Sequence, residues 1–395
     1  MNRTAVLCLV LLAVVLTACA APAPPPTPLP TLTPLPAPTA TPRPAPTATP
    51  RPAPHLDYGV HMFIAQHPET TQRDLQMAVD GGFHWQKSLF EWRQIEGAGK
   101  GQIDWSDADR VVHASNAAGL KIVARLDFEP DWARADHAHN GPPDKYQDYS
   151  DFVQAFVMRY RTGSSIGRVH AIEVWNEPNL DREWGNQTID ADSAADYVRL
   201  LDGAYRAAHA ADPNIVVISA GLSPSGVTDG HSADDVQYLQ WMYAAGLAGK
   251  YDVLGVHANT QAPDPAAALG SLKLFPDGSF YFRRVEQLRQ IMVDHGDAAR
   301  QIWLTEWGWT ADTVHPAYAW FAVSEDKKAS NLIAAFQYAR DHWAEWIGVM
   351  TVWTLADPTW DKTREEYWWA IANPDGSPRE AYNVIRKNRL SGLLP

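Results

Sequence analysis

The sequence KIVARLD at residues 121–127 is followed by YSDFVQAFVMRY at residues 149–160 and by HAIEVWNEPN at residues 170–179. The first and third segments begin as short apolar runs, as buried strands do, whereas the middle segment has the apolar spacing of a helix that covers a sheet. A strand, a helix and a second strand in this order form a βα unit with parallel strands. The same alternation continues on both sides of this stretch, which predicts a parallel sheet covered by helices.

Eight segments of the chain have the composition of buried strands. Helices are expected after them in turn, among them residues 70–81, 107–118, 149–160, 192–210, 280–295 and 331–344. Eight βα units predict a closed (β/α)8 TIM barrel. An open, doubly wound sheet is the alternative, but no glycine-rich phosphate-binding loop follows the first expected strand. The expected strands are residues 57–63, 84–90, 121–127, 170–175, 215–220, 252–257, 302–305 and 348–352.

The N-terminus has the features of a secretory signal. Residues 5–16 are an almost unbroken apolar run, and they lead into Leu16-Thr17-Ala18-Cys19. A run of this length is too short to remain in a bilayer as a spanning helix. The small residues before Cys19 resemble the lipobox of bacterial lipoproteins, which implies a signal peptide over residues 1–18, acylation of Cys19 and an extracytoplasmic, lipid-anchored protein at the cell surface. Ordinary cleavage after Ala18 is the alternative and would leave a secreted soluble protein.

Residues 19–54 are predicted to be a disordered Pro/Thr-rich linker. The octet APTATPRP at residues 37–44 recurs at residues 45–52. Such a segment has too few apolar side chains to form a core. Extended proline-rich chain rises roughly 3 Å per residue, so this linker could hold the domain up to about 100 Å from a membrane. The remaining residues, 55–395, have the length of one barrel domain.

Composition excludes several functions of that domain. Its residues include no cysteine, since Cys8 and Cys19 both lie before it, so thiol chemistry is excluded. The formal net charge of −13 repels nucleic acid and polyanionic sugars. A neutral carbohydrate fits better. No cofactor is expected. No catalytic metal is expected either, because His61 is not part of a His-x-His pair and the histidines within residues 137–139 are interpreted as a cleft wall.

Two glutamates stand where apolar strand segments end, which is where a barrel carries its active site. The segment IEVWNEPN at residues 172–179 contains Glu177, and IWLTEWGW at residues 302–309 contains Glu306. Strand alternation places Glu173, Trp175 and Glu177 on one side, toward the barrel interior. Three βα units separate the two glutamates, so they would face each other across the barrel mouth. One carboxyl group could protonate a departing glycosidic oxygen and the other could meet the oxocarbenium-like carbon.

The motifs NEP at residues 176–178 and TEWG at residues 305–308 resemble those of glycoside hydrolase clan A, near families 5, 39 and 42. The resemblance covers most of the domain and extends to WRQIE at residues 92–96 and PDWA at residues 130–133. It implies a retaining hydrolase that cleaves β-O-glycosidic bonds of a neutral glycan or glycoside by a two-glutamate double displacement. A transglycosylase, which shares the covalent intermediate, is one alternative.

The resemblance also implies roles for individual residues. Glu177 would be the acid/base, with a pKa raised by burial and by a neighbouring negative charge, and Glu306 would be the nucleophile. Asn176 would bind the sugar 2-hydroxyl, and Trp353 would form the floor of the reactive subsite. His257 is expected to hydrogen-bond the sugar or Glu306.

Further substrate-binding residues are expected beside these. The chain has 17 tryptophans, and flat aromatic faces at a cleft commonly hold sugar rings. Trp92 and Trp132 are therefore predicted to contact substrate. Glu173 is interpreted as a structural carboxylate that pairs with Arg125 or Lys87, because a buried carboxylate needs a cationic partner.

Two residues depart from the clan pattern. Lys87 stands where family members often have an arginine that holds the nucleophile, and Asn259 stands where many have a tyrosine that contacts it. Both are kept as candidate site residues. The glutamate pair is unaffected, but these changes suggest a further alternative, a non-catalytic carbohydrate-binding protein on the same barrel.

Overall fold

The computed structural model of the protein describes residues 56–136, 140–260, 262–271 and 277–390. The predicted signal peptide, the linker, Cys19 and the loop at residues 137–139 lie outside these residues. Within the described ranges, no helix combines the length and the apolar character needed to cross a membrane.

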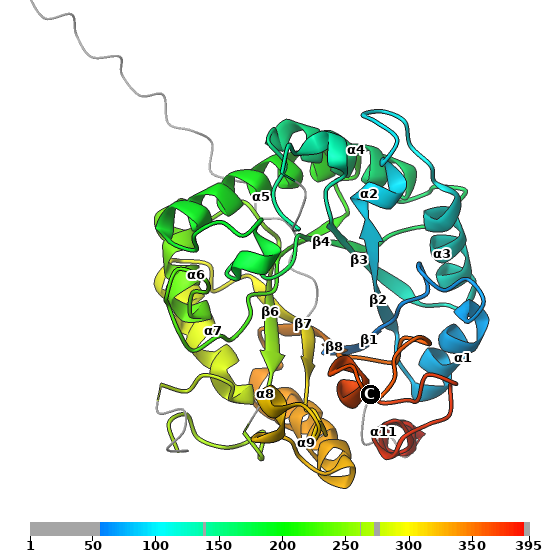
Figure 1. Cartoon of the computed structure of the whole chain (residues 1–395), viewed down its shortest axis with the longest axis vertical. Coiled ribbons are helices and arrows are strands. Elements are labelled where there is room, and N and C mark those ends of the chain that lie inside the picture. Colours follow the sequence, from blue (N-terminus) through cyan, green and yellow to red (C-terminus); the bar gives the residue numbers. More distant parts are fainter. Residues whose placement is uncertain (1–55, 137–139, 261, 272–276, 391–395) are drawn as a thin grey trace, which may run out of the picture. The chain divides into compact units, whose positions relative to one another are not determined.

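Eight parallel strands close into a barrel (Figure 1). Each strand pairs with the next along the chain, and the last pairs with the first through the register Gly59–Thr351. This topology confirms the predicted (β/α)8 barrel. The strands are β1 (Asp57–His61), β2 (Trp85–Glu91), β3 (Lys121–Asp127), β4 (Ala171–Val174), β5 (Val216–Ser219), β6 (Val253–Asn259), β7 (Gln301–Gly308) and β8 (Ile347–Val352).

The longer helices surround the barrel because each carries an apolar face that needs the outer face of the sheet as its partner. The longest, α5, starts with a capping box in which Asp190 and Ser193 bind each other's backbone. The α-helices are α1 (Thr71–Gly81), α2 (Trp92–Ile95), α3 (Ser106–Ala117), α4 (Tyr146–Arg159), α5 (Ala191–Ala211), α6 (Asp235–Ala244), α7 (Val285–Asp294), α8 (Pro316–Ala319), α9 (Glu325–Trp343), α10 (Glu366–Trp369) and α11 (Glu380–Leu390).

The barrel interior is closed at one end by an apolar plug. Each of the strands β2 to β8 contributes one buried side chain to it, and the rings of Trp85 and Trp303 meet edge to face with centroids 5.1 Å apart. A second, larger apolar layer lies between the strands and the helices. Because the plug fills the lower interior, only the carboxyl ends of the strands are left to form a cavity. The plug consists of Trp85, Val123, Ala171, Ile218, Val253, Trp303 and Val349.

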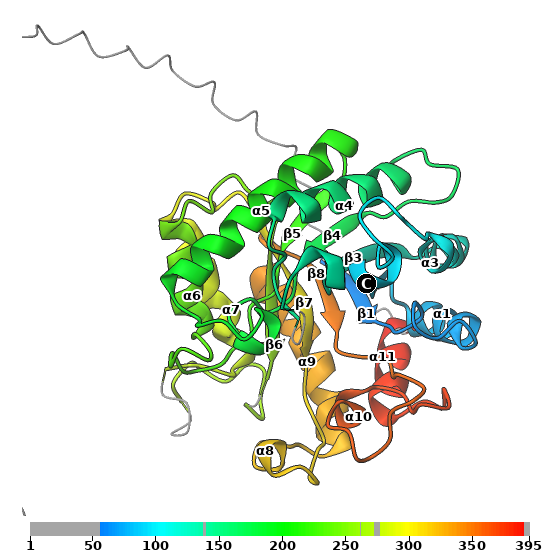
Figure 2. The same ribbon diagram turned by 45° about the horizontal axis from the view of Figure 1, so that its top comes forward.

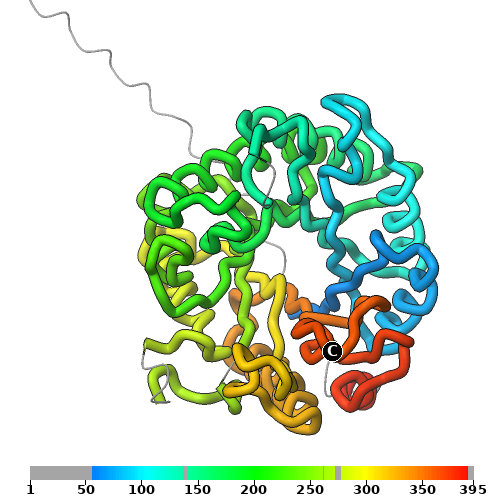
Figure 3. Tube along the Cα trace, in the orientation of Figure 1, coloured from blue at the N-terminus to red at the C-terminus, as the bar shows by residue number. Residues whose placement is uncertain are grey.

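The C-terminal helix completes the ring of helices. In Figure 3 the last described segment, in red, lies beside the first, in blue. The Tyr382 hydroxyl on α11 donates to the Met77 carbonyl oxygen on α1 at 2.9 Å. The two ends of the described domain are therefore joined in the helix layer as well as in the sheet.

Candidate active site

A cavity of about 700 Å³ opens at the carboxyl ends of the strands. Glu177, which follows β4, and Glu306, at the end of β7, both line it. Asn176, Asn259 and Trp353 line it as well. The structure thus brings together the two predicted catalytic carboxylates and three of the predicted substrate-binding residues.

A β-bulge aims the Glu306 side chain into this cavity. Trp303 of β7 points into the barrel, and strict alternation would send Glu306 to the opposite face. The pairing of β7 with β6 instead shifts by one residue, since Val256 pairs with Leu304 but His257 pairs with Glu306. The inserted residue reverses the alternation, so that Glu306 faces inward.

The same bulge turns Trp307 outward. Its ring lies edge-on to Phe336 of α9 at 4.7 Å, within the layer between strands and helices. The indole is fully buried there. The aromatic residue next to the glutamate therefore anchors the strand end to the helix layer.

After β4, an irregular backbone conformation rather than a bulge brings the chain to the cavity. Trp175 has φ 74° and Glu177 has φ 38°, both in the left-handed region that residues with side chains rarely adopt. The Trp175 ring packs edge to face on Tyr149 of α4, at 5.8 Å, rather than inside the barrel. The prediction that Trp175 faces the barrel interior is therefore wrong, because alternation stops where the strand ends at Val174.

Two cations and a histidine lie close to Glu306. Its Oε1 lies 3.0 Å from Lys87 Nζ, 3.5 Å from Arg125 Nη1 and 3.6 Å from His61 Nδ1. Burial raises the pKa of this carboxyl group, but the charges of Lys87 and His257 outweigh burial and hold the pKa well below its usual value. Glu306 is therefore ionised, as a nucleophile must be.

Glu177 also has cationic neighbours. His257 Nδ1 lies 2.8 Å from its Oε1, and Arg182 Nη2 lies 3.1 Å from its Oε2. Burial raises the pKa of Glu177, but the hydrogen bond from His257 and the two positive charges lower it below the usual value. The expected raised pKa of Glu177 is thus wrong for the free protein, and Arg182 is a neighbour of this carboxylate that the sequence did not indicate.

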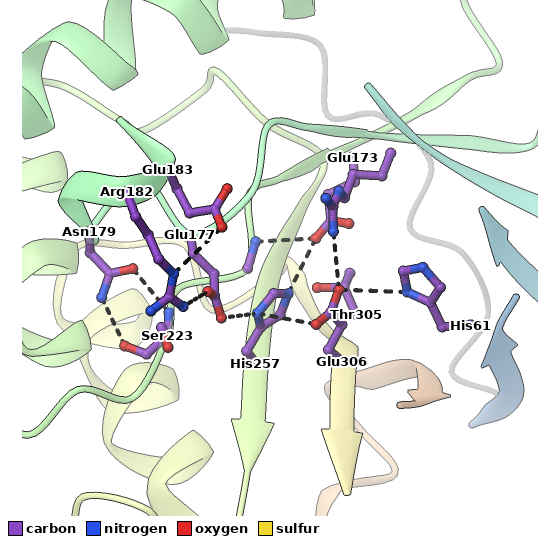
Figure 4. Close-up of polar contacts among 12 residues, drawn as sticks. His61, Glu173, Glu177, Asn179, Arg182, Glu183, Ser223, His257, Thr305 and Glu306 are labelled. Atoms are coloured by element: carbon purple, nitrogen blue, oxygen red, sulfur yellow. Dashed lines mark hydrogen bonds and ion pairs between the residues drawn. The ribbon is translucent and has the colours of Figure 1, made fainter. Parts of the chain in front are cut away.

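His257 bridges the two carboxylates (Figure 4). The Nδ1 that contacts Glu177 also lies 3.9 Å from Glu306 Oε2. Burial lowers the pKa of His257, but the charges of Glu306 and Glu177 raise it above 6.5 overall. The hydrogen bond of His257 therefore goes to Glu177, and its interaction with Glu306 is longer and electrostatic.

Gly221 makes room for this bridge. A Cβ atom at residue 221 would lie 2.1 Å from the His257 ring, which no real contact allows. Its backbone N–H also donates to Glu173 Oε1 at 3.2 Å. The absence of a side chain at Gly221 thus permits the imidazole to stand beside both carboxylates.

Lys87 occupies the place where the resemblance expects an arginine, and it is completely buried. Its Nζ lies 2.7 Å from Glu173 Oε2 as well as 3.0 Å from Glu306 Oε1. Glu173 therefore pairs with Lys87, one of its two predicted partners. The ammonium thus pairs with a buried structural carboxylate and with the candidate nucleophile at once.

The remaining predicted cavity residues offer groups for hydroxyls. The side-chain oxygens of Asn176 and Asn259 are buried and have no hydrogen-bond partner within the part of the chain that the structure describes. The Trp353 ring is partly exposed and meets the His61 ring edge to face at 4.7 Å. Asn259 thus lines the cavity without contacting Glu306 as the expected tyrosine would.

Trp92 and Trp132 do not line the cavity. Trp92 begins α2, which turns its fully buried ring into the helix layer, where the indole N–H donates to Glu96 at 2.6 Å. The Trp132 indole donates to the Glu96 carbonyl oxygen at 2.6 Å and its ring lies edge-on to Trp92. The prediction that these two tryptophans contact substrate is wrong. A helix begins at Trp92 directly after β2, and Trp132, on the short 3-10 turn Asp131–Ala133 after β3, packs against Trp92 rather than lining the cavity.

Several cavity residues could not be identified from strand ends. They belong to the segments that follow β4, β7 and β8, and the acidic, aromatic sequence EEYWW at residues 365–369 is the signal that could have indicated them. Among the described residues, no group of three or more histidine and acidic side chains is arranged to hold a metal ion. Among the missed cavity residues are Arg182, Glu183, Tyr318, Phe321, Glu365, Glu366 and Trp369.

Comparison with known proteins identifies solved structures that have a similar fold. No family model and no curated protein sequence matches the chain. A family 39 glycoside hydrolase from the gut symbiont Bacteroides cellulosilyticus WH2 is similar in structure, with a TM-score of 0.62 and 19% identity over 84% of this chain. A GH5_18 protein from Streptomyces cattleya, solved in complex with GlcNAc, has a TM-score of 0.61 and 17% identity over 87% of this chain and 82% of its own.

The exo-beta-1,4-mannosidase Op5Man5 from Opitutaceae bacterium strain TAV5 has a TM-score of 0.57 and 15% identity over 86% of this chain. Our chain spans 62% of the length of the Bacteroides protein and 60% of that of the mannosidase. Family 39 is one of the three families that the motifs at Glu177 and Glu306 resemble. The resemblance thus extends from these motifs to the fold of the whole barrel.

The buried Lys87 allows a test of the charge network by stability. Replacing Lys87 with Met leaves Glu173 and Glu306 close together without the shared ammonium, so the free energy of unfolding should fall by about 3–5 kcal/mol. Glu173→Gln in the same background should recover part of the loss because one of the two buried charges is removed. Urea denaturation followed by circular dichroism measures both effects.

The matched control is Lys100→Met. Lys100 pairs with Asp148 and Asp151 but its side chain is half exposed, so the loss should be about 0–1 kcal/mol. Equal losses in the two lysine variants would contradict the structural role assigned to Lys87.

Proposed function

We propose that this protein is a retaining glycoside hydrolase that cleaves β-O-glycosidic bonds in a neutral glycan or glycoside. The observation that carries the proposal is the pair of buried carboxylates, Glu177 and Glu306, held by one imidazole in the mouth of a closed barrel. Acetal cleavage needs a proton donor for the departing oxygen and an electron-rich group for the anomeric carbon. The two glutamates supply both.

Glu306 is the nucleophile in this proposal. Its ionised carboxylate attacks the anomeric carbon and forms a glycosyl ester, while Glu177 gives its proton to the leaving oxygen and the glycosidic bond breaks. Glu177 then takes a proton from water as that water attacks the same carbon. The ester bond breaks, Glu306 is released as carboxylate and the anomeric configuration is retained.

The geometry of His257 supports retention over inversion. His257 Nδ1 lies 2.8 Å from Glu177 Oε1 and 3.9 Å from Glu306 Oε2. These two carboxylate oxygens can therefore lie no farther apart than the sum of the two distances. That limit accommodates the spacing of about 5–5.5 Å in retaining enzymes, and it reaches only the lower edge of the range of about 6.5–9.5 Å in inverting ones.

The proton for the first step is stored on the Glu177–His257 pair. With its pKa lowered, Glu177 is ionised in the free protein, whereas His257 with its raised pKa holds a proton 2.8 Å away. The pair therefore contains one proton, which His257 can pass to Glu177 when a leaving oxygen arrives. Arg182 fixes the other carboxylate oxygen of Glu177.

Substrate contacts follow from the unpaired groups of the cavity. The side-chain oxygens of Asn176 and Asn259 can accept hydrogen bonds from sugar hydroxyls, and the partly exposed face of Trp353 suits the apolar face of a pyranose ring. The acidic side chains of the cavity wall, among them Glu183, Glu365 and Glu366, disfavour polyanionic sugars. These features support a neutral carbohydrate as the substrate.

Glutamine substitutions test the two catalytic roles. Glu306→Gln removes the nucleophile and should lower kcat by at least about a thousandfold on every aryl β-glycoside that the wild-type protein cleaves, because the ester cannot form. Glu177→Gln should slow glycosides of basic leaving groups far more than those of acidic phenols, which depart without protonation. Steady-state kinetics on a leaving-group series, with the product anomer identified by NMR, measures both.

Glu69→Gln, at an exposed site on the loop before α1, serves as the control and should leave the rates unchanged. Undiminished turnover by the Glu306 variant would refute the assignment. Binding of oligosaccharides without any product, even from the wild-type protein, would instead identify a carbohydrate-binding protein. Transfer of the glycosyl group to added sugar in place of water would identify a transglycosylase.

The stored proton makes a prediction about pH. Because Glu306 has a lowered pKa, activity should fall on the acid side only well below 4.5, as the carboxylate becomes protonated. Because His257 has a raised pKa, the Glu177–His257 pair keeps its proton at pH 6.5 and loses it as the pH rises through that higher pKa. The loss of activity on the basic side of the pH profile, its basic limb, should therefore lie above pH 6.5. His257→Asn should move the basic limb to lower pH by about a unit or more, since a lone carboxyl group then holds the proton.

The profile of kcat/KM against pH on one aryl glycoside measures both limbs. His84→Asn, at a half-exposed position away from the cavity, is the control and should keep the wild-type limbs. An unchanged basic limb in the His257 variant would show that its proton is not used.

The cellular location is part of the proposal. The lipobox-like segment before Cys19 supports acylation of that cysteine and attachment to the outer face of a membrane. In a bacterium fed a labelled fatty acid, the wild-type chain should incorporate the label and Cys19→Ser should not. Cys8→Ser, within the apolar run that precedes Cys19, is the control and should still be labelled. Label in the Cys19 variant would exclude this anchor.

A further inference from the structure

Exposed apolar side chains concentrate at the cavity and beside it. Of the six large apolar side chains that are strongly exposed within the described residues, Val227 lines the cavity, and Val314 and Trp320 lie on the segment between β7 and α9. Trp320 is 51% exposed and is the one aromatic residue among the six. An isolated exposed residue needs no explanation, but apolar side chains gathered at a binding cavity indicate contact with a ligand.

Aromatic rings form a continuous path from the cavity to Trp320. Tyr318 and Phe321 line the cavity wall. The ring of Phe321 meets that of Tyr318 edge to face at 5.7 Å and that of Trp320 at 4.7 Å. A ligand that leaves the cavity along this wall would therefore next meet the indole of Trp320.

The segment that carries these rings is held in place on both sides. His315 Nδ1 contacts Asp312 at 2.7 Å, and its Nε2 contacts the Thr363 carbonyl oxygen at 2.8 Å, which ties the segment to the chain before α10. The Trp320 indole N–H donates to the Ala317 carbonyl oxygen at 2.9 Å. Figure 2 shows α8 standing out from the barrel near α10. An aromatic face fixed in advance loses little entropy when it binds a ligand.

The neighbouring wall supplies polar groups at the same level. Glu365 and Glu366, at the start of α10, line the cavity together with Tyr318. The Glu365 carboxylate accepts the Trp369 indole N–H at 2.7 Å, which orients it. An apolar ring face beside oriented carboxylates matches a pyranose, whose C–H face is apolar and whose edge carries hydroxyl donors.

We propose that residues 312–321 form an outer sugar subsite in which Trp320 stacks on a pyranose unit beyond the sugars held in the cavity. The substrate is then an oligosaccharide or polysaccharide of neutral sugars, and small glycosides fill only part of the site. This inference rests on the proposed function for its substrate class.

The test compares long and short substrates in one variant. The probes are β-linked xylo-, cello- and manno-oligosaccharides of two to six units. For the series that the wild-type protein cleaves, Trp320→Ala should lower the ratio of kcat/KM for the hexasaccharide to that for the disaccharide roughly fivefold to tenfold, mainly through KM. Trp320→Phe, which keeps a flat ring, should restore part of the ratio.

Met158→Ala is the matched control, since Met158 is an exposed apolar residue of α4 outside the cavity wall, and it should keep the wild-type ratio. An equal loss on long and short substrates, or no loss, would overturn the outer subsite. If the wild-type protein cleaves neither these probes nor any aryl β-glycoside, the proposed hydrolase function fails by itself.

The subsite then remains testable by calorimetric binding of the same oligosaccharides. Tighter binding of the hexasaccharide than of the disaccharide, with the difference removed by Trp320→Ala, would support it. A length preference that survives Trp320→Ala, or the absence of binding by every probe, would overturn it.

Discussion

The ammonium of Lys87 is the charge on which the site depends. It lies at the centre of the barrel, fully buried, between Glu173 of β4 and Glu306 of β7. Burying a carboxylate without a cation is costly, and two carboxylates in one interior would repel each other. With Lys87 between them, Glu173 becomes part of the scaffold and Glu306 remains ionised at the cavity, while His257 adds a fourth charged group.

The fold was predictable from the sequence because the same strand and helix pattern occurs eight times along the chain. Eight apolar segments at regular spacing leave few architectures open, and errors at single boundaries do not change the result. The positions of Glu177 and Glu306 at the ends of two such segments were predictable for the same reason. Lys87 was identified through its place on the second strand, although its contact with Glu173 was one of two alternatives.

Side-chain directions were less predictable wherever the backbone leaves its regular period. The bulge before Glu306 and the left-handed conformation of Trp175 each reverse the alternation by a local change that no composition signal marks. The prediction that Trp92 contacts substrate was wrong for a related reason, since a helix begins directly at that residue. Arg182 and Tyr318 lie in connections after strands, where no periodic pattern determines position.

The pairing of β1 with β8 makes the site dependent on the whole chain. The Thr354 hydroxyl donates to the His61 carbonyl oxygen at 2.9 Å, so residues nearly three hundred positions apart meet beside the cavity. Contacts of such sequence separation form late, because a long loop must close first. A nascent chain that ends before Ile347 has two open sheet edges and no Trp353, so a partly synthesised or truncated molecule has an incomplete cavity and exposes edges that can pair with other chains.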